Sequence, residues 1–183
     1  DGYTYSNLYP YSEAYNRGFN YIRNSVVVTI DAYQGTVNYY VKDKNDPIIQ
    51  TYSAIFPSLF NDFQKMPQDL QEHIRYPKQL FAIQSEIYNT YHMSDPQVFY
   101  NREDLWETPK EIYGDQEMTM DPYYIVMREP DASKESFLMM RPFTPTNKPN
   151  MIAWLSASCD LDNYGQLKVF KFPKESLIFG PIQ

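Results

Sequence analysis

The side chains best suited to chemistry in this sequence are the acidic and aromatic residues of the run TYHMSDPQVFYNREDLW, positions 90 to 106. Glu103, Asp104 and the nearby Glu107 lie close along the chain to Tyr100 and Trp106. Glycoside cleavage uses two carboxyl groups held about 5 to 9 Å apart, and aromatic surfaces suit sugar or protein contact. These residue types permit a carboxylate enzyme, but spacing along the chain does not fix the distance between side chains.

The same run also has a structural interpretation, which we favour. Neighbouring acids commonly form a solvated helix face or an ion pair, here with Arg102. The step Asp95-Pro96 is typical of a helix start, with an N-cap residue followed by proline at the first helical position. We therefore predict that Asp95 caps a short helix. Apolar side chains then anchor the helical region to a sheet, and they are Val98, Phe99, Leu105 and Trp106.

No residue is assigned a catalytic role, so a candidate functional or interaction patch is defined by composition. It consists of His92, Tyr100, Arg102, Glu103, Asp104 and Trp106. Within this patch we expect His92 and Glu103 to occupy exposed polar positions, whose replacement leaves stability nearly unchanged.

The sequence offers no pattern for a metal or a serine nucleophile. His73 and His92, the two histidines, lie in different predicted helices and form no H-E-x-x-H motif. Cys159 is the single cysteine, and its apolar, alternating surroundings indicate a small core residue. No G-x-S-x-G elbow presents a serine. We expect neither a bound metal nor a cofactor.

The segment DLDNYG, residues 160 to 165, begins like a calcium-binding loop. Asp160 and Asp162 are spaced to offer oxygen ligands, with Gly165 at the turn. The twelfth position is Lys171 instead of a bidentate glutamate, and strands are predicted on both sides. The segment is therefore predicted to be a hairpin turn.

Charge and hydrophobicity limit the classes of partner. The 183 residues carry 16 Lys+Arg against 23 Asp+Glu, and the net charge of −7 disfavours nucleic acid and anionic lipid. No apolar stretch approaches the roughly 18 residues of a membrane span, so no direct membrane insertion is expected. The length fits one domain, residues 1–183, and the start at Asp1 suggests a piece of a larger protein.

The elements that would position these residues begin with a hairpin. Apolar and polar residues alternate on both sides of AYQG, where Gly35 can adopt a positive φ. We predict strands at 25–31 and 36–42. The aromatic stretch 9–25 before them is predicted to be weakly helical. Asp46-Pro47, Met66-Pro67 and Tyr76-Pro77 then predict three helices between 47 and 92.

Strands return in the second half of the chain, at 123–127, 137–143, 152–158 and 167–172. Short polar linkers between them favour antiparallel neighbours. The predicted fold class is α+β. We expect one antiparallel sheet of at least five strands, formed by the N-terminal hairpin and the C-terminal strands and covered on one face by a helical insert. In the last long helix, Leu80, Ile83, Ile87 and Tyr91 recur at helical spacing, with Phe81 and Tyr88 beside them, and predict its apolar side.

Long ordered motifs across the chain resemble the uncharacterised protein family 0182. They are NYIRNSVVVTIDAYQGTVNYYVKDKNDPIIQTYSAIFPSLF, YPKQLFAIQSEIYNTYHMSDPQVFYNREDLWETP, DPYYIVMREP, RPFTPTNKPNMIAWLSASCD and FPKESLIFGPIQ. The resemblance implies a large bacterial membrane protein with a multi-spanning part followed by a long soluble extracytoplasmic part. This chain then lies outside the cytoplasmic membrane, and its partners are the remainder of its own protein or an envelope component. The family supplies no activity, cofactor or catalytic residue.

Two functions remain open. The first is a non-catalytic extracytoplasmic binding or interaction module, which needs an exposed aromatic patch. The second is an envelope enzyme acting on a glycan or a lipid-linked substrate through carboxylates near Glu103 and Asp104, which needs a cleft with convergent acids.

Overall fold

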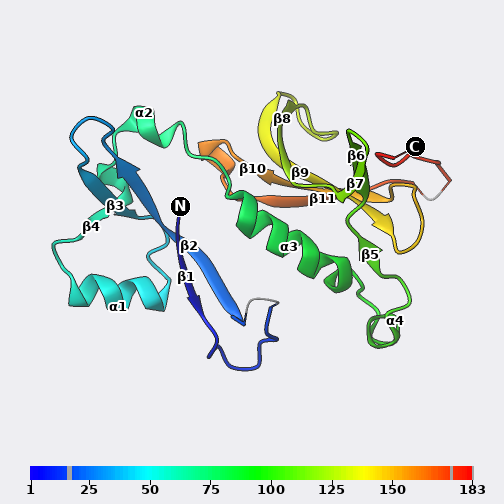
Figure 1. Ribbon diagram of the computed structural model, residues 1–183, viewed down its shortest axis with the longest axis horizontal. Coiled ribbons are helices and arrows are strands. Elements are labelled where there is room, and N and C mark those ends of the chain that lie inside the picture. Colours follow the sequence, from blue (N-terminus) through cyan, green and yellow to red (C-terminus); the bar gives the residue numbers. More distant parts are fainter. Residues whose placement is uncertain (16–17, 174, 183) are drawn as a thin grey trace. The chain divides into compact units, whose positions relative to one another are not determined.

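The predicted hairpin around Gly35 forms the centre of a four-stranded sheet in the computed structural model, which describes residues 1–15, 18–173 and 175–182 (Figure 1). The chain divides into two compact units, Asp1–His73 (unit 1) and Ile74–Gln183 (unit 2). Gly35 has a φ of 71°, and the Asp31 carboxylate accepts hydrogen bonds from the backbone N–H groups of the turn. A residue with a Cβ would be strained at this φ.

Unit 1 contains the strands β1 (Gly2–Ser6), β2 (Tyr21–Ile30), β3 (Val37–Val41) and β4 (Phe60–Asp62), in that order across the sheet. The first two pairings are antiparallel, whereas β3 and β4 are parallel. Helix α1 (Pro47–Ile55) connects the parallel pair, as such a crossover requires. The 3₁₀ helix η1 (Phe63–Lys65) and helix α2 (Gln68–Gln71) follow.

The weakly helical prediction for residues 9–25 is wrong where the structure describes that segment. Residues 2–6 and 21–30 are strands, and the described residues between them form a loop. Asn20 replaces backbone pairing in this loop, because its side chain accepts from the Tyr9 N–H (3.0 Å) and donates to the Tyr9 carbonyl (2.7 Å). The Tyr9 and Tyr21 rings stack with centroids 5.3 Å apart. Residues 16 and 17 lie outside the described chain.

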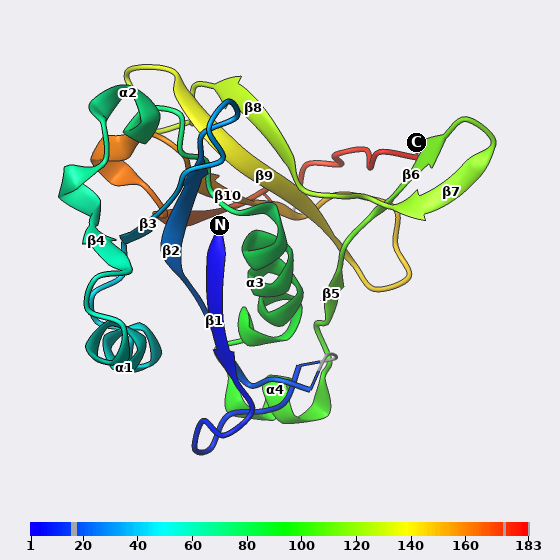
Figure 2. The same cartoon turned by 60° about the vertical axis from the view of Figure 1, so that its left-hand side comes forward.

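Unit 2 contains a five-stranded antiparallel sheet in which β11, β10, β9 and β5 are neighbours. Strand β8 also pairs with β9, beside which it lies in Figure 2. The strands are β5 (Trp106–Glu107), β8 (Tyr123–Met127), β9 (Ser136–Pro145), β10 (Ala153–Ser158) and β11 (Leu167–Lys171). A short 3₁₀ helix, η2 (Leu161–Asn163), connects β10 to β11. The four strands predicted for this half of the chain are confirmed.

Helix α3 (Lys78–Tyr91) packs against β9 and β5, and α4 (Pro96–Asn101) follows it. The buried residues of α3 are Phe81, Ile83 and Ser85, and the side chain of His92, just after the helix, is buried too. The predicted apolar side is right for Ile83 and Leu80, which are buried or pack against the core, and wrong for Ile87 and Tyr91, which are exposed. Ser85 is a polar residue on the buried side of α3, so it interrupts the apolar spacing that would mark that side. Its hydroxyl is satisfied in this buried position because it accepts a hydrogen bond from the buried Arg141 guanidinium, at 2.8 Å.

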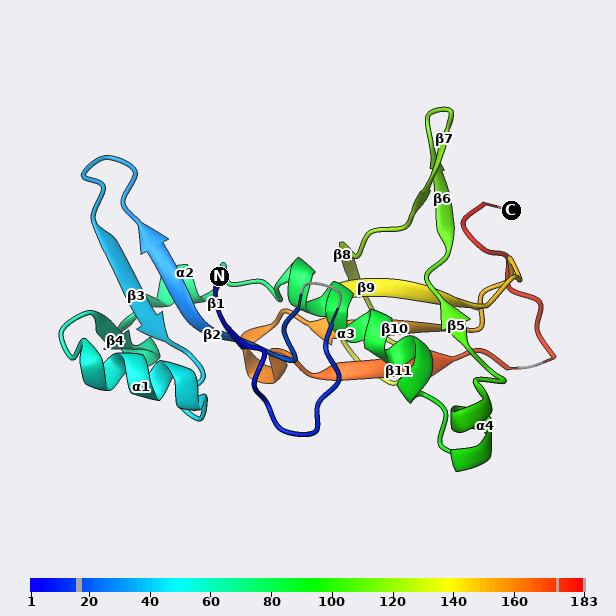
Figure 3. The ribbon, with the colours of Figure 1, turned by 60° about the horizontal axis from the view of Figure 1, so that its bottom comes forward.

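A separate hairpin, β6 (Lys110–Tyr113) and β7 (Gln116–Thr119), extends away from the five-stranded sheet (Figure 3). Its residues are almost all exposed and show no apolar alternation, so this hairpin is not predictable from the sequence pattern.

The α+β class is confirmed, as are three helices between 47 and 92. The prediction of one sheet is wrong, because the N-terminal hairpin and the C-terminal strands belong to different sheets. Within unit 2, α3 covers the C-terminal sheet. Alternation shows which residues are extended, but strand pairing is decided by contacts between distant segments.

Candidate functional site

The predicted patch is only partly brought together by the structure. The rings of His92 and Trp106 stack with centroids 3.7 Å apart. The His92 side chain is 3% exposed, and Trp106 as a whole residue is 6% exposed. The Nδ1–H of His92 donates to the Tyr88 carbonyl at 3.2 Å, since a carbonyl can only accept. The Nε2 atom of His92 lies 3.6 Å from Oδ2 of Asp104. The expectation of an exposed His92 is wrong, because Trp106 covers the imidazole.

The other members of the patch lie around the end of α4 and do not converge. Tyr100 is exposed, and Arg102 ends the helix with a left-handed φ of 54°. Glu103 is exposed, as predicted, and accepts a hydrogen bond from the Asn101 amide at 2.8 Å. The described contacts of Glu103 and Asp104 are to Asn101 and His92, not to Arg102. This arrangement lacks the convergent acids that hydrolysis of a glycan needs.

The predicted capping and turn structures are present. Asp95 caps α4, because its carboxylate accepts from the backbone N–H groups of Gln97 (2.8 Å) and Val98 (3.1 Å). The segment 160–165 is the connection between the antiparallel strands β10 and β11, with φ 77° at Gly165. Cys159 is buried, and desolvation raises the pKa of its thiol. Among the described residues, no group of three His, Cys, Asp or Glu side chains is placed to hold a metal ion.

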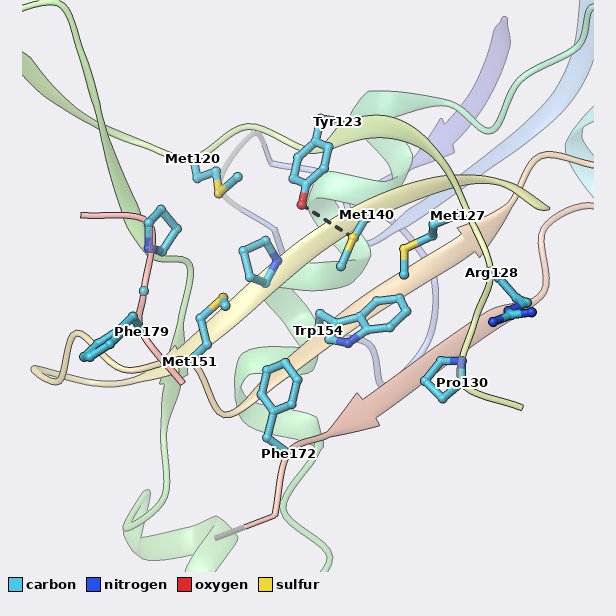
Figure 4. Close-up of a pocket in the computed structure, with 13 residues that line it drawn as sticks. Met120, Tyr123, Met127, Arg128, Pro130, Met140, Met151, Trp154, Phe172 and Phe179 are labelled. Carbon is cyan, nitrogen blue, oxygen red and sulfur yellow. Dashed lines mark hydrogen bonds between the residues drawn. The ribbon is translucent and has the colours of Figure 1, made fainter. Parts of the chain in front are cut away.

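A pocket that the sequence analysis did not predict lies in unit 2 (Figure 4). Its cavity volume is about 460 Å³. Four methionines contribute to its lining, and they are Met120, Met127, Met140 and Met151. Four aromatic residues also line the pocket, and they are Tyr123, Trp154, Phe172 and Phe179. The pocket is thus predominantly apolar, as small-molecule sites generally are.

The two faces of the C-terminal sheet explain the pocket. Side chains alternate between the faces of a strand. On β9, Met139 and Phe143 belong to the core beneath α3, whereas Met140 and Pro142 line the pocket on the opposite face. On β10, Leu155 belongs to the same core and Trp154 to the pocket. The face of the sheet opposite α3 therefore presents apolar side chains to the pocket.

The floor of the pocket is held by aromatic and sulfur contacts. The Trp154 indole stacks on Phe170 of β11 with centroids 4.3 Å apart and an interplanar angle of 17°. The Tyr123 hydroxyl donates to the Met140 sulfur at 3.5 Å, as drawn in Figure 4. These contacts fix the rings, while methionine side chains remain adaptable in shape.

The C-terminal segment forms one wall of the pocket through Phe179, Gly180 and Pro181. The Met151 N–H donates to the Ile178 carbonyl at 2.9 Å and attaches this segment to the sheet region. Gly180 is buried against the backbone carbonyl of Pro149, so closely that a Cβ atom would overlap it. The wall therefore requires glycine at this position for steric reasons.

The rim of the pocket carries a positive charge. Arg128 is exposed and is the one charged residue among the described residues that line the pocket (Figure 4). The adjacent Glu129 is buried, where it accepts a hydrogen bond from Ser156 (2.9 Å) and forms an ion pair with Lys168. The positive charge of Lys168 neutralises the negative charge of Glu129. The positive charge of Arg128 can therefore attract an anionic group to the rim.

Comparison with known proteins gives a family but no activity. The sequence profile of the Uncharacterised protein family (UPF0182) matches residues 1–183. A UPF0182 protein of Microcystis aeruginosa is 56% identical over 183 residues, which are 100% of this chain and 19% of the relative. One of Desulforamulus reducens is 54% identical over 184 residues, 100% of this chain and 20% of the relative. One of Methanospirillum hungatei is 50% identical over 189 residues, 100% of this chain and 21% of the relative.

The chain spans about a fifth of the length of the curated relatives it matches. No solved structure matches it. Within the described part of the chain, no helix has the length and apolar character needed to cross a membrane.

Proposed function

The chain belongs to the uncharacterised protein family UPF0182, and from this membership and the pocket of unit 2 we propose that it is a non-catalytic binding module of a larger integral membrane protein. The module lies outside the cytoplasmic membrane. It binds a small amphiphile, a molecule with an extended apolar body and an acidic group.

The composition of the pocket is the observation that carries this proposal. A volume of about 460 Å³ falls in the range of about 300 to 1,000 Å³ that small-molecule sites occupy. Flexible thioether side chains can adapt to an apolar chain of variable shape, and Trp154 gives it a flat surface. Arg128 at the rim favours a carboxylate or phosphate over a neutral or cationic group.

The placement of the acidic residues supports binding over catalysis. Glu103 and Asp104 are exposed and contact different partners, Asn101 and His92. Glu107 lines a separate cavity of about 440 Å³. Neither Glu103 nor Asp104 lines the apolar pocket. The apolar pocket therefore gives no support to the alternative of an envelope enzyme acting through these carboxylates.

The location outside the membrane is supported by the resemblance to large membrane proteins and by the length of the relatives, of which this chain covers about a fifth. Partners of the module are then the remainder of its own protein or an envelope component. Reporter fusions at Lys44 and Asn147, both in turns, would give the side of the membrane. Cytoplasmic signal from both positions would contradict the proposed location.

The binding proposal can be tested with 12-bromododecanoic acid, because bromine quenches tryptophan emission at short range. We expect saturable quenching that is lost in Trp154→Phe, since Trp154 lies in the pocket and Trp106 lies in the core beneath α3. Met127→Glu places a charge in the pocket and should raise the dissociation constant at least about tenfold, equivalent to about 1.4 kcal/mol.

Met118→Glu is the matched control, because Met118 is an exposed methionine of β7 that does not line the pocket. Its dissociation constant should stay at the wild-type value. Arg128→Gln should weaken binding of the acid by up to about fivefold, as an exposed ion pair permits, and leave binding of 12-bromododecanol unchanged. Equal effects of the two methionine variants, or no saturable quenching by a folded protein, would refute the proposal.

A further inference from the structure

Helix α1 of unit 1 exposes a continuous series of large apolar side chains. Tyr52, Ile55, Phe56 and Leu59 are 49%, 58%, 49% and 43% exposed. Tyr52, Ile55 and Phe56 are spaced i, i+3 and i+4, which places them on one side of the helix and its C-cap. Phe56 caps the helix, because its N–H donates to the Tyr52 carbonyl, and Leu59 lies in the turn that follows, where its N–H donates to the Phe56 carbonyl. We call these four residues the α1 stripe.

The rest of α1 is tied firmly to unit 1. Ile49 is 3% exposed and packs inward. The N-cap residue Asp46 is fully buried, and its carboxylate accepts hydrogen bonds from Thr4 (2.5 Å), Ser25 (2.5 Å) and Tyr21 (2.8 Å) as well as from the Ile48 N–H (3.0 Å). The α1 stripe is therefore displayed by a helix whose beginning is anchored to β1 and β2. A pre-organised apolar surface costs less entropy to bind than a flexible one.

The charge distribution around α1 indicates a protein partner instead of a lipid surface. Residues 47–61 contain no charged side chain, and residues 1–73 contain eight Asp+Glu and five Lys+Arg. Helices that lie on membranes carry Lys and Arg on their polar face to attract anionic headgroups. An uncharged helix on an acidic unit lacks this attraction. An exposed apolar stripe at the end of a helix instead suits docking into an apolar groove of a protein.

The lengths of the relatives limit the set of partners that could cover the α1 stripe. The relatives are about five times as long as this chain, which covers 19% and 20% of two of them. Most of such a polypeptide thus lies outside residues 1–183 and is held near unit 1 at a high effective concentration by covalent connection. A second molecule has no such advantage.

We propose that the α1 stripe is the surface through which unit 1 docks onto another segment of the same polypeptide, outside residues 1–183, that presents a complementary apolar face. This proposal is independent of the ligand pocket in unit 2, because none of the stripe residues lines that pocket.

Photo-crosslinking in the full-length protein in its own membrane tests the proposal. A benzophenone is attached to Ile55→Cys, and crosslinked peptides are identified by mass spectrometry. The matched control is Gln34→Cys, an exposed position in the β2–β3 turn of the same unit. We expect crosslinks from position 55, at least fivefold above those from position 34, to peptides of the same polypeptide outside residues 1–183. Tyr52→Ser combined with Leu59→Ser should reduce this yield by at least half.

Each other result would overturn the proposal. A product of twice the mass containing only this protein would indicate a second copy, and a lipid adduct would indicate the bilayer surface. Crosslinks to a different protein, or only within residues 1–183, would assign the stripe to another contact. A yield equal to that of position 34 would show that water covers the stripe. Circular dichroism of each labelled chain confirms that these outcomes do not arise from misfolding.

Discussion

The imidazole of His92 lies on the indole of Trp106, with ring centroids 3.7 Å apart and an interplanar angle of 19°. The pair joins the end of α3 to β5 and fills space next to Phe143, whose ring centroid is 5.5 Å from that of Trp106. A histidine that composition placed in a functional patch is thus part of the core packing of unit 2.

His92→Ala should lower the free energy of unfolding by about 1 to 2 kcal/mol, because it removes a buried ring and an aromatic contact. Trp106→Ala should cost more, about 3 to 5 kcal/mol. Urea unfolding followed by circular dichroism measures both. His73→Ala is the control, since His73 is exposed and should change stability by less than about 0.5 kcal/mol. Equal effects of the two histidine variants would contradict the packing role of His92.

The buried carboxylate of Asp46 makes unit 1 sensitive to acid. Desolvation, the largest influence, would raise its pKa, but hydrogen bonds from Ser25, Thr4, Tyr21 and the Ile48 N–H together lower it below the usual 3.8. The folded state therefore binds this proton less readily than the unfolded state. The resulting stability is fully present above pH 3.8 and is lost as the pH falls below it.

Asp46→Asn should destabilise unit 1 at pH 5 by about 1 to 3 kcal/mol, because an amide N–H₂ then faces hydroxyl donors in a buried site. The difference from wild type should narrow as the pH falls through 3.8. Pepsin cleavage within residues 1–73, expressed at each pH as the ratio of variant to wild-type rates, would measure this. Asp69→Asn, at an exposed position, serves as the control. A ratio that does not change with pH would be evidence against the Asp46 contribution.

Asp95→Ala should destabilise the protein by about 1 kcal/mol, because two N–H groups at the start of α4 lose their acceptor. Asp95→Asn keeps an acceptor oxygen and should restore most of that loss. Glu103→Gln, at an exposed position of the same region, should leave the thermal midpoint unchanged. If Asp95→Ala were as stable as Glu103→Gln, the two capping hydrogen bonds would contribute nothing measurable to stability.

Gly180→Ala should separate the C-terminal segment from Pro149, because no space exists there for a Cβ atom. Since Phe179 and Pro181 form a wall of the apolar pocket, the dissociation constant for 12-bromododecanoic acid should rise several-fold. Ser176→Ala, an exposed position of the same segment, should bind the acid like wild type. Unchanged binding by Gly180→Ala would show that this wall does not contact the ligand.

Local signals in the sequence predicted much of the fold. Asp46-Pro47 and Asp95-Pro96 start helices where expected, because capping and proline geometry involve only neighbouring residues. The hairpin turn at Gly35 and strands β8 to β11 follow from equally local patterns. Strand β1 was missed, since its extended form depends on pairing with residues of β2 that lie fifteen or more positions later in the chain.

The functional regions were harder to predict because they depend on several segments at once. Burial of His92 requires Trp106, and the polar Ser85 on the buried side of α3 is intelligible only beside Arg141. The pocket needs alternate residues of β8, β9 and β10 on one face of a sheet, together with a wall from the C-terminal segment. Its methionines, taken singly, are indistinguishable from ordinary core residues.

The alternation along β9 and β10 also limits how this protein can diverge. Even-numbered positions such as Met140, Pro142 and Trp154 face the pocket, whereas odd-numbered positions such as Met139 and Leu155 face α3. Substitutions at the even positions can change ligand preference without changing the side chains that pack against α3. An insertion or deletion of one residue within either strand would exchange the two sets. Selection can therefore adjust this strand pair by replacing side chains, but it must hold the length of each strand constant.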